Sequence, residues 1–257
     1  DFLNPDGEPI DSHAKRLSEL LSMAWPGEFG PLMSHIFRKS LITLASEGRV
    51  TLKSLIQYIR LQAEHSPSMK ERDKAFSLVS RLSELATGGL GLVFGGRGEP
   101  SDDLFEDDVI IDLSELESDR DRNILSWLLL KRLYEYRRFR KPFLPHITII
   151  EEAHHVAPPG PTIVDYMLME LRKFNESLWI IDQRPSELSR TVLSLTSTIV
   201  SFRLRGYADQ EALSATMGLD GTSFGSLTKG VGIIVTPRIL NPIQISVRHV
   251  VRPIWLA

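Results

Sequence analysis

Two adjacent carboxylates, Glu151 and Glu152, follow a short apolar run that contains Ile147, Ile149 and Ile150. A strand buried on both faces of a parallel sheet is continuously apolar, so this run predicts such a strand. Ligands of open α/β sheets bind where these strands end. In nucleoside triphosphatases the first acid there helps to hold Mg²⁺ through its water shell, and the next can orient or deprotonate the attacking water. We predict these roles for Glu151 and Glu152 in turn; a pair of solvated carboxylates at a strand end is the alternative.

A second apolar run, residues 178–181, is followed by Asp182 and by a neutral amide, Gln183. The two strand ends should meet at one edge of the sheet, which puts Gln183 beside the two acids. An amide donates and accepts hydrogen bonds without titrating, so Gln183 is predicted to contact water or the γ-phosphate of a nucleotide. Arg184 is expected to order this loop and to contribute to the nucleotide site. Pro185 prevents the strand from continuing.

The elements that must position these residues are legible in the apolar pattern. Residues 8–87 lack strand signals and show helical periodicity over 11–23, 31–45, a stretch from Thr51, and 68–86. From residue 109, apolar runs alternate with helical stretches, which predicts an α/β fold with a mainly parallel sheet. The expected strands are 109–113, 147–150, 178–181, 198–204, 231–236 and 243–247, and the expected helices are 120–138 and 162–174. The last strands, in a stretch with few helical signals, are expected to form an antiparallel edge.

Composition agrees with a globular enzyme without identifying one. The chain has 257 residues, of which 42% are hydrophobic and 25% charged, and no cysteine, so disulfides and thiolate metal sites are excluded. No apolar run approaches the roughly 20 residues that cross a bilayer, so we expect no membrane insertion and a cytoplasmic location. The net charge of −3 is unevenly spread, with ten acids and one arginine over 101–121. Such asymmetry suits either subunits that meet through opposite charges or two solvated surfaces.

The chain resembles the HerA branch of the HerA/FtsK ATPases at four motifs: Ile-Ile-Glu-Glu-Ala-His at 149–154, Glu-Leu-Arg-Lys-Phe at 170–174, Gln-Arg-Pro-Ser at 183–186 and Phe-Arg-Leu-Arg at 202–205. Residues 1–7 and the expected strand at 109–116 are similar too. The resemblance implies a RecA-like P-loop core that uses ATP and Mg²⁺, assembles as a hexameric ring and moves along double-stranded DNA. It also implies a NurA-like nuclease as a partner. Type IV secretion ATPases share much of this pattern.

The resemblance also suggests a division of the chain. Residues 1–7 would be the end of a core strand and its turn, 8–87 a helical subdomain, 88–108 a connecting loop and 109–257 the ATPase core. The first part of the loop, 88–101, is expected to be a flexible glycine-rich connection.

Multimeric ATPases often supply a cation from the neighbouring subunit to the transferring phosphoryl group. Arg172 and the pair Arg203 and Arg205 are the candidates, because alternation along an extended segment puts both members of the pair on one face. Salt-bridged surface arginines are the alternative for each of them.

Two other charged clusters attract a functional interpretation. Residues 137–141, Arg-Arg-Phe-Arg-Lys, could contact nucleic acid, but cations at a helix C-terminus, favoured by the helix dipole, are the preferred interpretation. His154 and His155 lie close to two acids, yet their adjacent spacing is not a zinc-ligand pattern, and no zinc is expected. His154 is expected instead to pack or to form hydrogen bonds near the acids.

Departures from the family pattern define the alternatives. No phosphate loop with the pattern G-x-x-x-x-G-K-[ST] occurs, and the nearest segment, 91–98, has Arg97 in place of the lysine and acids behind it. We therefore expect a longer protein whose upstream part carries the loop. Asp182 replaces a small hydroxyl residue of the family and adds negative charge beside Gln183. A secretion or conjugation ATPase and a degenerate, non-hydrolysing assembly module are the competing interpretations, with DEAH-type helicases the least favoured.

Overall fold

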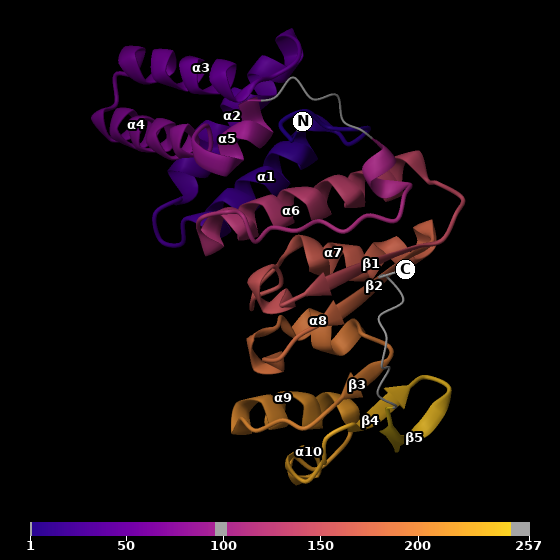
Figure 1. Ribbon diagram of the computed structural model, residues 1–257. Helices are drawn as coiled ribbons and strands as arrows, with labels where there is room; N and C mark the ends of the chain where they lie inside the picture. Colours follow the sequence, from indigo (N-terminus) through magenta and orange to yellow (C-terminus); the bar gives the residue numbers. More distant parts are fainter. Residues whose placement is uncertain (1, 96–101, 248–257) are drawn as a thin grey trace. The chain divides into compact units, whose positions relative to one another are not determined.

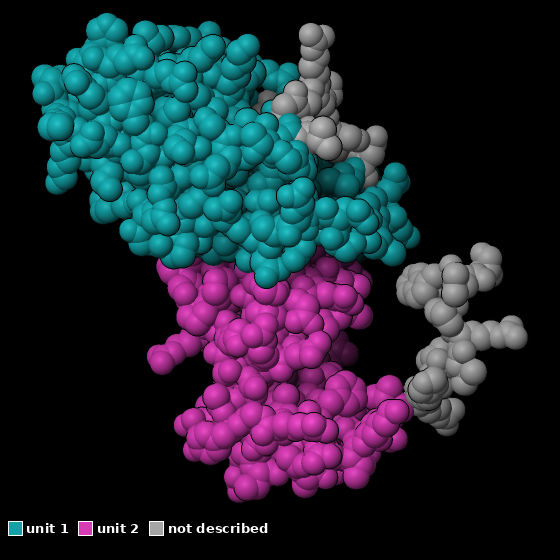
Figure 2. All heavy atoms as spheres, turned by 60° about the vertical axis from the view of Figure 1, so that its left-hand side comes forward, with its two compact units in different colours: residues 1–145, 173–176 teal, residues 146–172, 177–257 magenta. Residues whose placement is uncertain are grey.

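The computed structural model describes residues 2–95 and 102–247. They form two compact units, coloured separately in Figure 2: residues 1–145 with 173–176, and residues 146–172 with 177–257. The chain therefore passes from one unit to the other at 145/146, 172/173 and 176/177. Each unit is described by itself.

The first unit is helical, as the sequence predicts for residues 8–87. Its helices are α1 (Ile10–Ala24), α2 (Pro31–Glu47), α3 (Leu52–His65), α4 (Met69–Glu84), α5 (Gly88–Gly95) and α6 (Asp119–Glu135), shown in Figure 1. Side-chain caps fix where several of them begin, because a hydroxyl before the first turn accepts an otherwise unpaired backbone N–H. Thr51 caps α3, Ser68 caps α4 and Ser118 caps α6. The core of the unit includes the buried side chains of Leu17, Phe37, Leu55, Leu78 and Leu128.

Two expectations for this unit are wrong. Residues 88–95 form α5 rather than a flexible connection, and residues 96–101 of the same expected segment lie outside the described residues. The expected strand at 109–113 is not formed: Val109, Ile110 and Ile111 are exposed, with 91% exposure for Ile110. An apolar run becomes a strand only where a neighbouring backbone pairs with it, and neither sheet of the described residues includes this one.

The second unit begins with a parallel pair of strands, β1 (His146–Glu151) and β2 (Glu176–Ile181), connected through α7 (Ile163–Glu170). Thr162 and Asp165 form a capping box at the start of α7. Burial of both strand faces, expected from the apolar runs, is wrong for the described residues. Large side chains on alternate positions are about half exposed: Ile147, Ile149, Trp179 and Ile181. With two strands in this sheet, one face keeps its apolar side chains uncovered.

The remainder of the second unit contains an antiparallel sheet of order β3-β4-β5, as expected for this stretch. Its elements are α8 (Arg190–Leu195), β3 (Ile199–Ser201), α9 (Tyr207–Met217), α10 (Thr222–Gly225), β4 (Val231–Thr236) and β5 (Ile239–Ser246). Ile199 pairs with Val235 and Ile233 with Gln244. A small core joins the helices to the sheet through Leu213, Met217, Phe224, Leu227 and Ile233.

The expectation of a tail with few helices is wrong at α9. Its apolar residues, Leu213 and Met217, are four positions apart and pack on the sheet, but the polar residues around them hide this short periodicity. None of the helices among the described residues is both long and apolar enough to cross a membrane.

Candidate functional site

The ends of β1 and β2 bring a carboxylate and an amide together. The Gln183 amide nitrogen donates a hydrogen bond of 2.8 Å to Glu152 Oε1. Both residues are exposed, and so is Glu151, the last residue of β1. Carboxylate oxygens at such an edge are hard donors of the kind that Mg²⁺ and its water shell prefer, so the residues present fit a magnesium-bound triphosphate. The arrangement places one acid in contact with a non-titrating hydrogen-bonding group, with a second acid next to it in the chain.

The backbone turns sharply at Glu152. This residue has φ 50° and ψ 48°, the left-handed conformation that non-glycine residues seldom adopt. A short 3₁₀ turn, Ala153–His155, follows immediately. The turn carries His154 back beneath the strand end, where its side chain is buried. The Glu152 side chain is about half exposed and that of His154 is buried, yet Glu152 Oε2 lies 3.7 Å from His154 Nδ1.

Asp182 joins the two strand ends. Its Oδ2 atom accepts hydrogen bonds from the His154 backbone N–H at 2.7 Å and from His154 Nδ1 at 2.8 Å. Its Oδ1 atom accepts the Arg184 backbone N–H at 2.6 Å. The Asp182 side chain is 4% exposed, so these three donors compensate a nearly desolvated carboxylate. The charge that the sequence sets beside the site is thus directed away from Gln183 and towards His154.

Arg184 completes the arrangement from the other side of the imidazole. Its guanidinium donates to His154 Nε2 and, at 2.9 Å, to Glu187 Oε1. Because Nε2 accepts this bond, Nδ1 must carry the imidazole hydrogen that Asp182 receives. The contacts therefore run from Asp182 to His154, then to Arg184 and then to Glu187. Gln183 lies in the sequence between Asp182 and Arg184.

A second set of bonds holds the loop that follows. The Ser189 backbone N–H donates to the Ala157 carbonyl at 2.8 Å, and the Ser189 hydroxyl donates to Asp165 Oδ1 at 2.6 Å. Asp165 is at the same time the third helical residue of α7, the position that completes the capping box with Thr162. The loop after β1, the start of α7 and the start of α8 are therefore tied to one another.

The predicted site residues are only partly brought together. Glu152 and Gln183 are in contact, Glu151 is adjacent, and Arg184 contacts the turn through His154. Arg172 lies in the 3₁₀ turn Leu171–Phe174, and Arg203 and Arg205 follow β3; all three side chains are exposed. Their predicted role in a neighbouring subunit's site stays a prediction.

Sequence reasoning missed the structural role of Asp182, although it expected His154 to pack or to form hydrogen bonds near the acids. A signal was present in the alternation of the strand end: residues 182 and 184 project to one side and residue 183 to the other. The partner could not be predicted from the sequence, because His154 reaches Asp182 only through the left-handed turn at Glu152.

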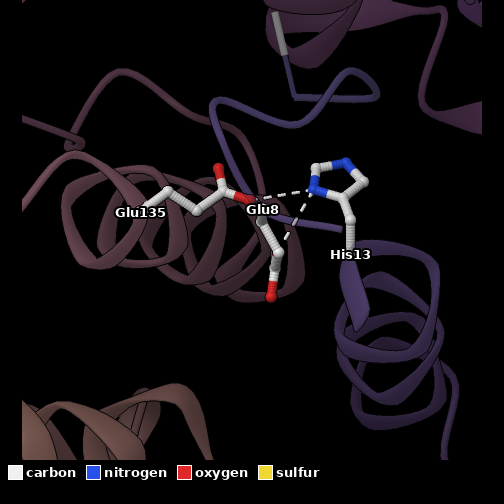
Figure 3. Close-up of side chains that lie close together, drawn as sticks. All are labelled: Glu8, His13 and Glu135. Carbon is white, nitrogen blue, oxygen red and sulfur yellow. Dashed lines mark hydrogen bonds and ion pairs between the residues drawn. The ribbon is translucent and has the colours of Figure 1, made fainter. Parts of the chain in front are cut away.

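A buried polar cluster in the first unit is the other candidate. Glu8, His13 and Glu135 are the group among the described residues whose ligand atoms are close enough to hold a metal ion (Figure 3). His13 Nδ1 lies 2.8 Å from Glu135 Oε1 and 3.6 Å from Glu8 Oε2. All three side chains are buried.

Lys131 already supplies the cation of this cluster. Its ammonium nitrogen lies 2.8 Å from His13 Nδ1, 3.4 Å from Glu8 Oε2, and forms an ion pair with Glu135. Arg16 pairs with Glu8 from the other side. Burial lowers the pKa of Lys131 to about 8, although the charge of Glu135 opposes this. The cluster is an internal ion-pair network, and a divalent ion would compete with a tethered charge.

The basic run 137–141 is a helix end, in agreement with the preferred interpretation. α6 continues into a π-helical turn, Tyr136–Arg140, and Lys141 adopts the left-handed conformation that ends it. Arg137 is buried within the first unit, where its guanidinium donates to the carbonyls of Phe174 and Asn175 and pairs with Glu176. This residue is a structural arginine.

Comparisons with known proteins bear on the fold of the chain. The chain is 32% identical over 112 residues to the DNA double-strand break repair helicase HerA of Pyrococcus furiosus, a match that covers 40% of this chain and 20% of the relative. The fold is similar to VirB4 of Thermoanaerobacter pseudethanolicus, with a TM-score of 0.72, 17% identity, and coverage of 96% of this chain and 71% of that chain. The chain has the fold of a RecA-like P-loop ATPase, similar to the HerA/FtsK proteins. The resemblance seen in the sequence is thereby confirmed.

The plasmid coupling protein TrwB, in complex with the non-hydrolysable GTP analogue GDPNP, shares the same fold. Its TM-score is 0.69 at 12% identity, with coverage of 96% of this chain and 70% of that chain. No known family profile matches the sequence. The chain spans about a fifth of the length of its HerA relative.

Proposed function

We propose that this chain is part of an ATP-driven DNA translocase or helicase motor of HerA type. The observation that carries the proposal is the contact of 2.8 Å between Gln183 and Glu152 at the ends of two parallel strands. In phosphoryl transfer to water the protein does little covalent chemistry and mainly positions the reactants. An acid that orients the water and an amide that does not titrate, both at this edge of the sheet, are suited to that task. The Pyrococcus furiosus relative supports DNA as the track.

The residues divide the work as follows. MgATP, when bound, supplies the phosphoryl group that is transferred. Glu151 would hold the water shell of the magnesium ion, and Glu152 would orient the attacking water and accept a proton from it. Gln183 would contact the γ-phosphate, and Arg184 orders the loop that follows β2. Arg172, Arg203 and Arg205 are proposed to reach the nucleotide of an adjacent subunit in a hexameric ring.

The proposed setting is DNA end processing together with a NurA-like nuclease, with double-stranded DNA passing through the ring. The division into a helical subdomain over 8–87 and an ATPase core over 109–257 is part of the same proposal.

The test is the substitution Glu152→Gln in the full-length protein. It removes the base but keeps shape and hydrogen-bonding capacity, so we expect ATP to bind while steady-state hydrolysis falls by at least about a hundredfold. Glu211→Gln is the matched control, because Glu211 is an exposed glutamate on α9. Unchanged turnover in the Glu152 variant would remove this residue from the mechanism.

The dependence of hydrolysis on DNA separates the alternatives. A DNA translocase is expected to hydrolyse ATP faster when linear duplex DNA is added. Hydrolysis that ignores duplex DNA would favour a secretion or conjugation motor. Absence of both nucleotide binding and hydrolysis would favour an assembly module.

A further inference from the structure

The buried pair Asp182 and His154 has no part in the proposed reaction, although each of them is close in the chain to a residue that has one. Gln183 follows Asp182 in the chain, and Glu152 is separated from His154 by Ala153 alone. Both side chains of the pair are 4% exposed. Burying a carboxylate and an imidazole has a cost in free energy that a surface position would avoid.

We propose that Asp182 and His154 are positioning residues that fix Glu152 and Gln183 relative to each other. The inference rests on the proposed function for its effect on catalysis, and on the described contacts for its geometry. Asp182 accepts the backbone N–H of His154 and the backbone N–H of Arg184, so one carboxylate spans the turn after β1 and the turn after β2. Gln183 is the residue between Asp182 and Arg184, so the bond between those two also restrains its backbone.

The backbone at Glu152 supplies an independent argument. A non-glycine residue in the left-handed region is strained by on the order of 1–2 kcal/mol, and such strain persists where the surrounding structure determines it. The His154 N–H bond to Asp182, two residues beyond Glu152, is the constraint that this turn meets. Without it the turn can relax, and the Glu152 carboxylate then moves with the backbone.

The hydrogen on the imidazole is also fixed. Arg184 donates to Nε2, which must therefore be unprotonated, and Nδ1–H donates to Asp182. A protonated Nε2 would place two donors against each other. The structure thus assigns to His154 the neutral form with hydrogen on Nδ1, which is the form that binds Asp182 and Arg184 at once.

A first experiment reads this assignment without using activity. In the full-length protein with ¹⁵N-labelled histidine, two-bond ¹H–¹⁵N spectra in slightly alkaline buffer should show His154 as the Nδ1–H tautomer, with His154→Gln identifying its signals. In Asp182→Asn the population should move towards Nε2–H. His154 found as Nε2–H in the parent protein would overturn the proposal.

A second experiment measures ATP turnover. Asp182→Asn and His154→Gln should each lower kcat by roughly tenfold or more and leave KM for ATP within about twofold, because the site is displaced rather than its binding surface removed. The double variant should be no worse than the worse single one, since residues that act as a unit are not additive. Asp220→Asn is the matched control: Asp220 likewise accepts a backbone N–H, that of Thr222, in the turn before α10.

The outcomes separate the two proposals. If Glu152→Gln abolishes hydrolysis while the Asp182 and His154 variants keep the parent kcat, the positioning role is wrong and the motor stands. If the parent protein does not hydrolyse ATP, the proposed motor function is wrong, and the tautomer measurement still tests the contacts of Asp182 and His154. Asp182→Ser, which restores the hydroxyl of the family pattern, serves if the asparagine variant does not fold. For it too a lowered kcat at unchanged KM supports the proposal, and a parent-like kcat contradicts it.

Discussion

Glu152 shows how one residue can carry a functional and a structural requirement together. Its carboxylate meets the Gln183 amide, while its backbone adopts a conformation that glycine would adopt without strain. A glycine at this position would satisfy the turn but lose the acid. The side chain is therefore retained at the cost of backbone strain, as is common where chemistry and geometry compete.

His13 provides a prediction for the dependence of stability on pH. Burial lowers the pKa of His13 below its ordinary value of 6.5, although the hydrogen bond with Glu135 opposes this. The unfolded chain therefore takes up a proton first as the pH falls, and the folded state loses stability as the pH falls through 6.5. We expect His13→Gln to flatten this loss, with a difference in slope of at most about 1.4 kcal/mol per pH unit.

Urea unfolding of both proteins from pH 8 to pH 5 is the measurement. His35→Gln is the control, because His35 is exposed on α2. Glu8, Lys131 and Glu135 face His13. Burial alone would raise the pKa of Glu135, but His13 and Lys131 hold it below its ordinary range, so its own contribution is lost only at more acidic pH. Equal slopes for the parent and the His13 variant between pH 7 and pH 6 would contradict the prediction.

At the scale of elements, Gly7 fixes how the chain enters α1. It has φ +82°, and a Cβ atom built on it would lie 2.9 Å from Phe139 Cβ, which no real pair of atoms tolerates. Gly27 has nearly the same φ, +78°, but open space around it. Gly27→Ala is therefore expected to cost roughly 1–2 kcal/mol for the backbone alone, and Gly7→Ala at least about 1 kcal/mol more.

Denaturant unfolding of the two variants separates backbone strain from the clash. Equal losses in the two proteins would mean that Phe139 moves aside at no cost.

The helices and strands differ in how well they can be predicted from their sequences. α1 to α4 and α6 are predicted to within a few residues, because long helices have many apolar positions in phase. Hydroxyl caps also mark the starts of α3, α4 and α6. The run at 109–113 has the composition of a strand, yet strand formation needs a partner that composition cannot specify. α5 is glycine-rich and was expected to be irregular, but Leu90 is buried and anchors it.

The site divides in the same manner. The closeness of Glu152 and Gln183 follows from strand ends at one sheet edge, which is a property of the fold class. The bond from His154 to Asp182 depends on a single left-handed residue, and no spacing rule reports the sign of φ. Their roles in hydrolysis stay predictions until the variants are measured.

At the scale of the whole assembly, the arginine hypothesis can be tested by mixing subunits. If Arg203 and Arg205 act on the neighbour's nucleotide, a variant with both changed to alanine and a Glu152→Gln variant should each be inactive alone. In randomly mixed rings about a quarter of the interfaces would combine an intact glutamate with intact arginines, and hydrolysis should return to about that level.

Steady-state hydrolysis of full-length protein, unfolded and refolded together or co-expressed, measures the recovery. Mixed rings that stay inactive would show that the arginines act on the nucleotide of their own subunit, and an arginine variant that is active alone would show that they do not act in hydrolysis. Arg190→Ala, an exposed arginine at the start of α8, is the control.

The chain passes between its two units at three places, and this affects how truncated forms of the protein would behave. A chain that starts at His146 would carry Glu176 without Arg137, its buried ion-pair partner, and would leave an unpaired carboxylate at the first residue of β2. A chain that stops at Pro145 would leave Arg137 without the carbonyls of residues 174 and 175. Neither half is a self-sufficient piece, so deletion mapping of this protein should be done by substitution rather than by truncation.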